Sequence, residues 1–384
     1  MTAQPTPEEP GVATHGRVLV LGRAPEVMET VLAELVSLGV DAVGSTEPET
    51  APTAFDARAF DLVAIGGGLR GPVGDSLRAA FLARNPSLRV IDASAPTAAV
   101  VVRDALRGTP QPTVDLDAYC ARIGYDGPRT PSMETLRALQ RLHTAAIPFE
   151  AIDVLLGKGV DIAPEAVDAK LIGRRRGGYC FEQNGLFRRV LRTIGFEVEG
   201  LAGRVRWMLP ADAPRPARTH MVLRVVIDGH PWLADVGFGV CVPTEPLDLR
   251  TTEPQPTAHE TFRLFPYGGG MLLQAKLGEA WASVYEFGTD PVEDIDYVTG
   301  NWFTSTHPGS HFRSMLNVAC VTDEARYTLR DNRLTVRTPD GGMDRRQLDA
   351  DALERVLAER FGLPVEPEWR TMIGQAVAVG SKAA

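Results

Sequence analysis

The chain has 384 residues, of which 44% are hydrophobic and 23% are charged, as in ordinary globular proteins. This length favours at least two domains, because a single hydrophobic core seldom grows so large. The formal net charge of −9 disfavours nonspecific binding to nucleic acid, since phosphates need an excess of cationic side chains. The arginine clusters, at 174–176 and 188–189, are short and local.

Residues 1–16 are polar, acidic and rich in proline, and we expect them to form a flexible tail. They lack the basic start and apolar core of a signal peptide. The longest apolar runs, such as 62–65 and 98–102, are far too short to span a membrane. The four cysteines form no Cys-x-x-Cys pair, which disfavours a disulfide framework or a zinc site. We therefore expect a cytoplasmic protein that binds neither a membrane nor a metal.

Residues 17–108 alternate between short apolar runs and segments with a helical rhythm. Strands are predicted at 17–22, 40–43, 60–65 and 88–91, and helices at 25–38, 76–85 and 97–106. The first run is apolar almost throughout and ends in glycine, which is typical of a strand buried on both faces. Such alternation predicts a small parallel sheet with helices on both faces, similar in layout to receiver or flavodoxin-like domains.

This α/β unit lacks the full signature of a nucleotide site. Gly22 is followed by Arg-Ala-Pro rather than by Gly-x-Gly-x-x-Gly, and the glycine-rich run 66–71 follows a middle strand. A receiver domain would carry acidic residues at these two places. We therefore interpret residues 17–108 as an accessory domain, which could hold two copies of the chain together as a homo-oligomer.

Residues 109–113, Thr-Pro-Gln-Pro-Thr, predict a linker. The region that follows, 114–200, has a mainly helical pattern. Within it, Ser132 precedes an apolar stripe at Met133, Leu136 and Leu139, as expected at the start of a helix.

From residue 201 to residue 300 the pattern changes to short strand-like runs broken by glycine, proline and aspartate. Asp228-Gly229 between two apolar runs is a strong hairpin signal. Residues 301–384 combine further strand-like runs with a helical segment at 351–361.

Three segments contain the side chains of a nucleophilic catalyst. Cys180 follows two glycines and precedes a helical segment, while His220 and Asp235 lie in two later motifs, Arg-Thr-His-Met and Trp-Leu-Ala-Asp-Val-Gly-Phe-Gly. A thiol, an imidazole and a carboxylate are the parts of a cysteine nucleophile with its base and the group that orients the base. A helix start and a nearby imidazolium both favour the thiolate. Each residue alone has an ordinary structural explanation, but the set predicts an acyl-transfer enzyme.

From about residue 114 to residue 384 the chain resembles the arylamine N-acetyltransferase family. The matching stretches are Ile-Pro-Phe-Glu at 147–150, 175–184, 218–220, 232–239, 246–247 and 301–312. The resemblance implies a cysteine-protease-like acetyltransferase, with a helical bundle at 114–200, a β-barrel at 201–300 and an α/β lid at 301–384. It also implies ping-pong transfer from acetyl-CoA to an arylamine or hydrazine, without a metal.

The resemblance further implies a role for each matching residue. Cys180 would be the acetylated nucleophile, His220 its base, and Asp235 the group that holds the imidazole. The implied substrate-binding residues are Phe149, Thr219, Phe238, Gly239 and Phe312. Arg176 and Glu150 would form a buried ion pair that positions the cysteine loop. The chain departs from the common family pattern at Ala151, where an asparagine often follows Pro-Phe-Glu.

The motifs leave three other functions open. An amide synthase of the same fold, which closes a macrolactam, would use the same three residues. A thiol hydrolase or transglutaminase-like enzyme would also use them, although the flanking motifs fit it less well. A regulatory protein that keeps the fold only as a scaffold is disfavoured by the intact set.

Overall fold

The computed structural model describes residues 17–69, 71–86, 88–93, 95, 98–106, 114–210, 212–290 and 292–382. The chain forms two compact units, Met1–Pro112 and Thr113–Ala384. Each unit has hydrophobic clusters of its own, as expected of separately packed domains. The predicted tail at 1–16 and the predicted linker at 109–113 lie outside the described residues.

The first unit contains the small parallel sheet that the sequence predicts. Its strands are β1 (Arg17–Leu21), β2 (Asp41–Ser45), β3 (Leu62–Gly66) and β4 (Arg89–Ala93). They lie in the order β2-β1-β3-β4, and all three pairings are parallel. The helices are α1 (Pro25–Ser37), α2 (Ala51–Ala54), α3 (Pro72–Arg84) and α4 (Ala98–Leu106), with 3-10 turns at Ala57–Ala59 and Gly67–Leu69.

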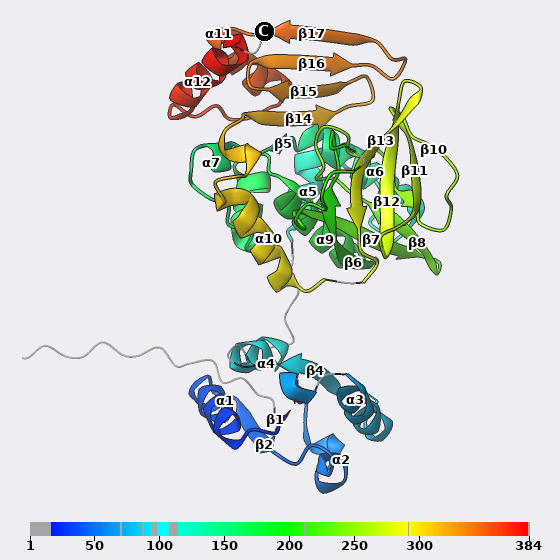
Figure 1. The fold of residues 1–384 in the computed structure, drawn as a ribbon, viewed down its shortest axis with the longest axis vertical. Coiled ribbons are helices and arrows are strands. Elements are labelled where there is room, and N and C mark those ends of the chain that lie inside the picture. Colours follow the sequence, from blue (N-terminus) through cyan, green and yellow to red (C-terminus); the bar gives the residue numbers. More distant parts are fainter. Residues whose placement is uncertain are drawn as a thin grey trace, which may run out of the picture. The chain divides into compact units, whose positions relative to one another are not determined.

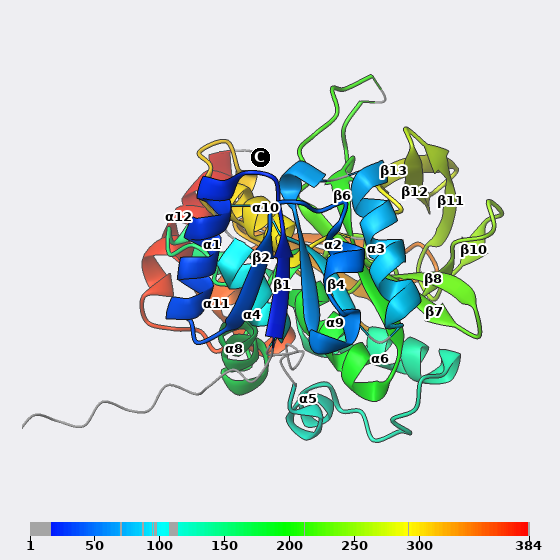
Figure 2. The ribbon, with the colours of Figure 1, turned by 90° about the horizontal axis from the view of Figure 1, so that it is seen from below.

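Residues 18–21 of strand β1 are all apolar and buried, and helices cover both faces of the sheet to which they belong. Val18 and Val20 belong to one hydrophobic cluster with residues of α1 and α4. Leu19 and Leu21 belong to another with residues of α2 and α3. Figure 2 shows the strands between α1 on one side and α3 on the other. Successive side chains of a strand point to opposite faces, so a two-sided sheet needs an unbroken apolar run.

Helix α3 begins at Pro72, four residues before the predicted start at residue 76. Proline is favoured in the first turn of a helix, because its missing N–H would have no partner there. The predicted start of the last helix of this unit, Thr97, lies outside the described residues, and α4 is described from Ala98.

The second unit begins with a helical region (Figure 1). Its helices are α5 (Leu116–Ile123), α6 (Met133–Ala146), α7 (Ile152–Leu155), α8 (Pro164–Asp168) and α9 (Cys180–Ile194), with a short π-helix at Ala169–Gly173. The Ser132 hydroxyl accepts a hydrogen bond from the Thr135 N–H and caps α6, as the sequence predicts. Helix α9 contributes Phe187, Val190 and Leu191 to the largest cluster and forms the centre of this region.

An eight-stranded antiparallel sheet follows in the order β10-β11-β12-β13-β6-β7-β8-β9. Its strands are β6 (Glu197–Val205), β7 (His220–Ile227), β8 (His230–Ala234), β9 (Leu247–Asp248), β10 (Gln255–Pro256), β11 (Thr261–Tyr267), β12 (Gly270–Leu277) and β13 (Ala280–Phe287). Asp228 and Gly229 both have positive φ angles, 52° and 74°, and form the predicted two-residue hairpin between β7 and β8. This sheet corresponds to the predicted barrel, left open between its edge strands β10 and β9 in the described part of the chain.

The last region contains a five-stranded sheet in the order β17-β16-β15-β14-β5. Its elements are β5 (Phe149–Glu150), α10 (Asp294–Thr306), a 3-10 turn (His311–Arg313), β14 (Asn317–Val321), β15 (Arg326–Arg330), β16 (Arg333–Arg337), β17 (Met343–Gln347), α11 (Ala350–Arg355), a short π-helix (Val356–Arg360) and α12 (Trp369–Lys382). Strand β5 comes from the helical region and pairs with β14 through Phe149 and Ala319. The predicted boundaries at residues 200 and 300 fall inside β6 and α10.

Among the described residues, no helix is both long enough and apolar enough to cross a membrane.

His143 on α6 is a buried polar side chain with a defined set of partners. Its Nδ1 accepts a hydrogen bond from the Tyr119 hydroxyl at 2.8 Å, and its Nε2 donates to Gln183 Oε1 at 2.6 Å. Burial lowers the pKa of His143 to about 4; the hydrogen bond to Gln183 opposes this change, and the Arg122 charge adds to it. The folded protein therefore holds this ring neutral.

We predict that this histidine makes the folded state sensitive to acid. In the unfolded chain, His143 becomes protonated near its reference pKa of about 6.5, while in the folded protein it stays neutral down to about pH 4. The contribution of this residue to the free energy of unfolding is therefore full above about pH 6.5 and decreases as the pH falls towards 4. The loss approaches about 1.4 kcal/mol per pH unit. Urea unfolding between pH 7 and pH 5 should show a smaller pH slope for His143→Gln than for the unchanged chain. The exposed His230→Gln is the control, and an equal slope in all three proteins would contradict the prediction.

Candidate active site

Cys180 is the first residue of α9, and a network of buried charges holds the loop before it. The Glu182 carboxylate accepts a hydrogen bond from the Tyr179 N–H at 3.0 Å and pairs with Lys170 at 2.8 Å. Both ionic side chains are buried. The thiol therefore lies at the N-terminus of a fifteen-residue helix, where the backbone dipoles favour negative charge.

The ion pair expected from the sequence, Arg176 with Glu150, lies beside this loop. Arg176 Nε donates to Glu150 Oε1 at 2.9 Å, and a terminal nitrogen of Arg176 reaches Asp153 at 3.2 Å. The guanidinium also lies 4.7 Å from the ring centre of Trp369. Asp153 pairs with Lys170 at 2.8 Å and so joins the two ion pairs into one network.

His220 and Asp235 are brought together by the hairpin of β7 and β8. His220 is the first residue of β7, Asp235 directly follows β8, and the register pairs Leu223 with Ala234. The ring Nε2 of His220 donates to Asp235 Oδ2 at 2.8 Å. The other carboxylate oxygen accepts from the Asn184 side chain at 2.9 Å and from the Gly237 N–H at 2.7 Å.

Asn184 joins the helix that carries the thiol to the loop that carries the carboxylate. Besides its bond to Asp235, its amide donates to the Met221 carbonyl at 2.7 Å and accepts from the Val236 N–H at 3.0 Å. A Cβ atom at Gly237 would lie 2.7 Å from both the Cys180 Cα and the Asn184 amide nitrogen, so this close approach requires glycine.

The buried pair of His220 and Asp235 is held in its ionic form. Burial disfavours both charges, but the charge and hydrogen bond of Asp235 raise the pKa of His220 above its usual value. Burial also raises the pKa of Asp235, but the charge and hydrogen bond of His220, together with the hydrogen bonds from Asn184 and Gly237, outweigh burial and lower it. The positive ring is therefore present at neutral pH and is lost only as the pH rises beyond this raised pKa.

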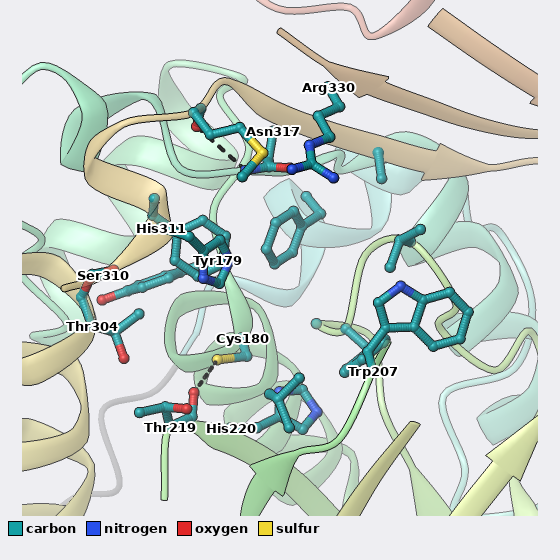
Figure 3. Close-up of a pocket in the computed structure, with 18 of the residues that line it drawn as sticks. Tyr179, Cys180, Trp207, Thr219, His220, Thr304, Ser310, His311, Asn317 and Arg330 are labelled. Atoms are coloured by element: carbon teal, nitrogen blue, oxygen red, sulfur yellow. Dashed lines mark hydrogen bonds between the residues drawn. The ribbon is translucent and has the colours of Figure 1, made fainter. Parts of the chain in front are cut away.

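The thiol of Cys180 lies next to this pair. Its Sγ donates to the Thr219 carbonyl at 3.4 Å, and Cys180 also contributes to the raised pKa of His220. Because Nε2 of the ring is bonded to Asp235, Nδ1 is the nitrogen left for the thiol. Figure 3 shows Cys180, Thr219 and His220 together at one end of the cavity.

A cavity of about 540 Å³ opens in front of the thiol. Among the residues that line it are Phe149, Tyr179, Trp207, Phe238, Phe303 and Phe312. Phe312 lies 5.9 Å from Phe149 and 6.2 Å from Tyr179 between ring centres, and Phe238 lies edge to face with His220 at 5.3 Å. These walls suit a flat apolar ligand and exclude water from the thiol.

Four of the five expected substrate-binding residues line this cavity, namely Phe149, Thr219, Phe238 and Phe312. Gly239 is not among the described residues that line it. It has a positive φ angle of 74°, and a Cβ atom there would lie 2.7 Å from the Phe149 ring. Gly239 therefore supports the ring of Phe149 from behind.

Sequence reasoning missed several residues of the site. Asn184 lies within the cysteine motif, but nothing in the sequence indicates its partners at Met221 and Asp235, so far along the chain. The buried pair of Lys170 and Glu182 lies near the motif but has no sequence signature either. Tyr285 on β13 packs 4.7 Å from the His220 ring centre. Burial and the charge of Asp235 raise the pKa of Tyr285, and its hydroxyl has no hydrogen-bond partner among the described residues.

Within the described parts of the chain, no group of three or more His, Cys, Asp and Glu side chains is arranged to hold a metal ion. The chemistry that the site offers is that of a thiol, an imidazole and a carboxylate.

We predict that Lys170 is essential to the fold around the thiol. Lys170→Met would leave Glu182 buried without its cation, at a cost of about 3–5 kcal/mol in the free energy of unfolding. The double change Lys170→Met with Glu182→Gln should recover part of this loss. Lys158 forms an exposed pair with Glu368, so Lys158→Met should cost less than about 1 kcal/mol. Chemical unfolding measures all three, and equal losses for the two single changes would contradict the prediction.

Comparison with known proteins gives matches over the second unit. A family model described as N-acetyltransferase matches residues 132–370. The arylamine N-acetyltransferase of Mycolicibacterium smegmatis is 46% identical over 254 residues, which are 65% of this chain and 92% of that protein. The solved structure of the Mycobacterium marinum arylamine N-acetyltransferase has a TM-score of 0.66 at 44% identity and covers 69% of this chain and 99% of its own.

A second structure of the Mycobacterium marinum protein, solved in complex with CoA, matches with a TM-score of 0.64 at 43% identity. It covers 69% of this chain and 97% of its own. The resemblance found in the sequence motifs is therefore confirmed. Residues 17–108 lie outside the match to the family model.

Proposed function

The chain belongs to the arylamine N-acetyltransferase family, and we propose that it transfers an acetyl group from acetyl-CoA to an aromatic amine or hydrazine. The observation that carries this proposal is the position of Cys180 beside His220 and Asp235 in a cavity with aromatic walls. The relatives named above are arylamine N-acetyltransferases, and one of them is known in complex with CoA.

In the first half-reaction, the Cys180 sulfur attacks the thioester carbonyl of acetyl-CoA. His220 holds the proton of the thiol, and its positive ring favours the attacking thiolate. A tetrahedral intermediate forms and then expels the thiolate of CoA, which takes the proton from His220. The products are free CoA, an acetyl thioester on Cys180 and a neutral His220 ring. Asp235 stabilises the ring while it is charged.

In the second half-reaction, the nitrogen of the amine attacks the acetyl thioester. His220 accepts a proton from the nitrogen, the carbon–sulfur bond breaks, and the Cys180 thiolate is restored beside the charged ring. The amine competes with water for the same carbonyl, so apolar walls that exclude water favour transfer over hydrolysis. Phe149, Phe238 and Phe312 supply these walls.

Arg176 and Glu150 have a positioning role in this proposal. Their network fixes the loop before Cys180 and does not reach the reacting atoms. Thr219 and Gly239 shape the cavity, the first through its carbonyl at the thiol and the second by supporting Phe149.

The remaining expectations stay predictions. Three of them rest on the sequence alone. They are the partition of the second unit at residues 200 and 300, the cysteine-protease-like character of its fold, and the cytoplasmic location. The same holds for residues 17–108 as an accessory domain that joins two copies of the chain.

Release of CoA thiol from acetyl-CoA tests the proposed function. We predict that continued release, beyond the single CoA that acetylation of each enzyme molecule liberates, depends on an added arylamine or hydrazine. It should be lost in Cys180→Ala, because no other thiol lies in the cavity lining of the described chain. Cys120→Ala, a change of a buried cysteine on α5, should retain the activity. Continued release without any amine would indicate a hydrolase, and release that survives in Cys180→Ala would contradict the mechanism.

A further inference from the structure

The cavity has a second polar region, which lies apart from the thiol. Asn317 on β14 and Arg330 on β15 are directly opposite each other in the antiparallel register, so their side chains leave the same face of the sheet. Both line the cavity. Figure 3 shows them side by side at the end of the cavity opposite Thr219 and His220. The cavity thus has a reactive end and a distal polar end.

The distal end makes the cavity positive. Of the described residues that line it, Arg330 alone has a permanently charged side chain, and none has a carboxylate. His311 also lines the cavity, and burial together with the Arg330 charge lowers its pKa, so its ring is neutral at neutral pH. A cationic cavity in a chain with a net charge of −9 is a local feature that the overall composition does not explain.

Arg330 also differs from the other arginine on its strand. Arg326 is fully buried and pairs with Glu260 through two nitrogens, at 3.1 and 2.6 Å. Arg330, four residues further along the strand and on the same face, has no ion pair with any described residue and borders solvent as well as the cavity. The strand therefore uses one guanidinium for structure and leaves the other available to a ligand.

Between the two ends the cavity is apolar. Phe149 and Phe312 contact each other beside the thiol. Ala319 lies opposite Phe149 in the pairing of β5 with β14 and is on the same face of the sheet as Asn317 and Arg330, so it continues this wall towards Arg330. A ligand that fits this sequence of surfaces has an amine at Cys180, a flat apolar body, and an anion at its far end.

We propose that Arg330 makes the enzyme selective for aromatic amines that carry a carboxylate at the end remote from the amine. This inference rests on the proposed transferase function and names the acceptor class of the same site. A guanidinium binds a carboxylate through two parallel hydrogen bonds, which gives both affinity and orientation. The carboxylate held at Arg330 directs the amine of the acceptor towards the acetyl group on Cys180.

The test compares acids with matched neutral amides at a fixed concentration of acetyl-CoA. Suitable pairs are 4-aminobenzoate with 4-aminobenzamide, and the longer 4-aminophenylacetate with its amide. The ratio of kcat/KM for acid over amide is measured in the unchanged chain, in Arg330→Met and in Arg330→Glu. Arg333→Met is the matched control, because Arg333 faces Arg330 across the hairpin but is not among the cavity-lining residues that the structure describes.

We expect the ratio to favour the acid in the unchanged chain and in Arg333→Met. It should fall about tenfold in Arg330→Met, which is the effect of one charge-assisted contact at a partly exposed site. Arg330→Glu should reverse the preference, because the acid then meets a like charge. The acid whose ratio is larger is the one whose length, from amine to carboxylate, better matches the separation of Cys180 and Arg330.

Two results would overturn this inference alone. One is transfer to both amines with a ratio that Arg330→Met leaves unchanged. The other is a change confined to the KM for acetyl-CoA, absent when acetyl-dephospho-CoA is the donor, which would assign Arg330 to a phosphate of the donor. Failure of the unchanged chain to acetylate any arylamine would instead contradict the proposed function, and this inference with it.

Discussion

The catalytic arrangement depends on the contact between Asn184 and Asp235. The thiol belongs to a helix and the imidazole belongs to a strand, and these elements come from different layers of the second unit. Asn184 lies one turn after Cys180 on α9 and binds the Asp235 carboxylate as well as the backbone on either side of the β7–β8 hairpin. Because the amide satisfies three buried groups at once, a small shift of the helix against the sheet would leave polar atoms without partners. This requirement fixes the distance between nucleophile and base.

The charges around the site divide into two sets with different tasks. Glu150, Asp153, Lys170, Arg176 and Glu182 are partners of one another and hold the loop before Cys180. His220 faces the cavity, and Asp235 behind it keeps a positive ring beside the thiol. Burial is costly for every one of these charges, so each needs its partner. Arg330 belongs to neither set, and its free guanidinium gives the cavity its polarity.

Much of this arrangement could be predicted from local patterns. The motifs around Cys180, His220 and Asp235 are short and contiguous, and the hairpin signal at Asp228-Gly229 brings the last two together. Contacts between distant segments could not be predicted. Strand β5 has only two residues and becomes a strand because β14, some 170 residues later, supplies its partner. Asn317 and Arg330 reach the cavity, and Tyr285 reaches the His220 ring, through sheet pairing, which leaves no periodic trace in a single sequence. Pro72 is a typical first residue of a helix. Gly71 and Gly74 beside it interrupt the periodic pattern of apolar residues, so the predicted helix starts later, at residue 76.

The proposed reaction passes through one covalent intermediate, and intact-protein mass spectrometry measures it directly. The protein would be mixed with acetyl-CoA without any amine, and the modified residue located by peptide mapping. We predict a mass increase of one acetyl group, located on Cys180. It should disappear when an arylamine is added, with formation of the acetylated amine. An unmodified protein that still acetylates the amine would contradict this prediction, and so would an acetyl group on any residue other than Cys180.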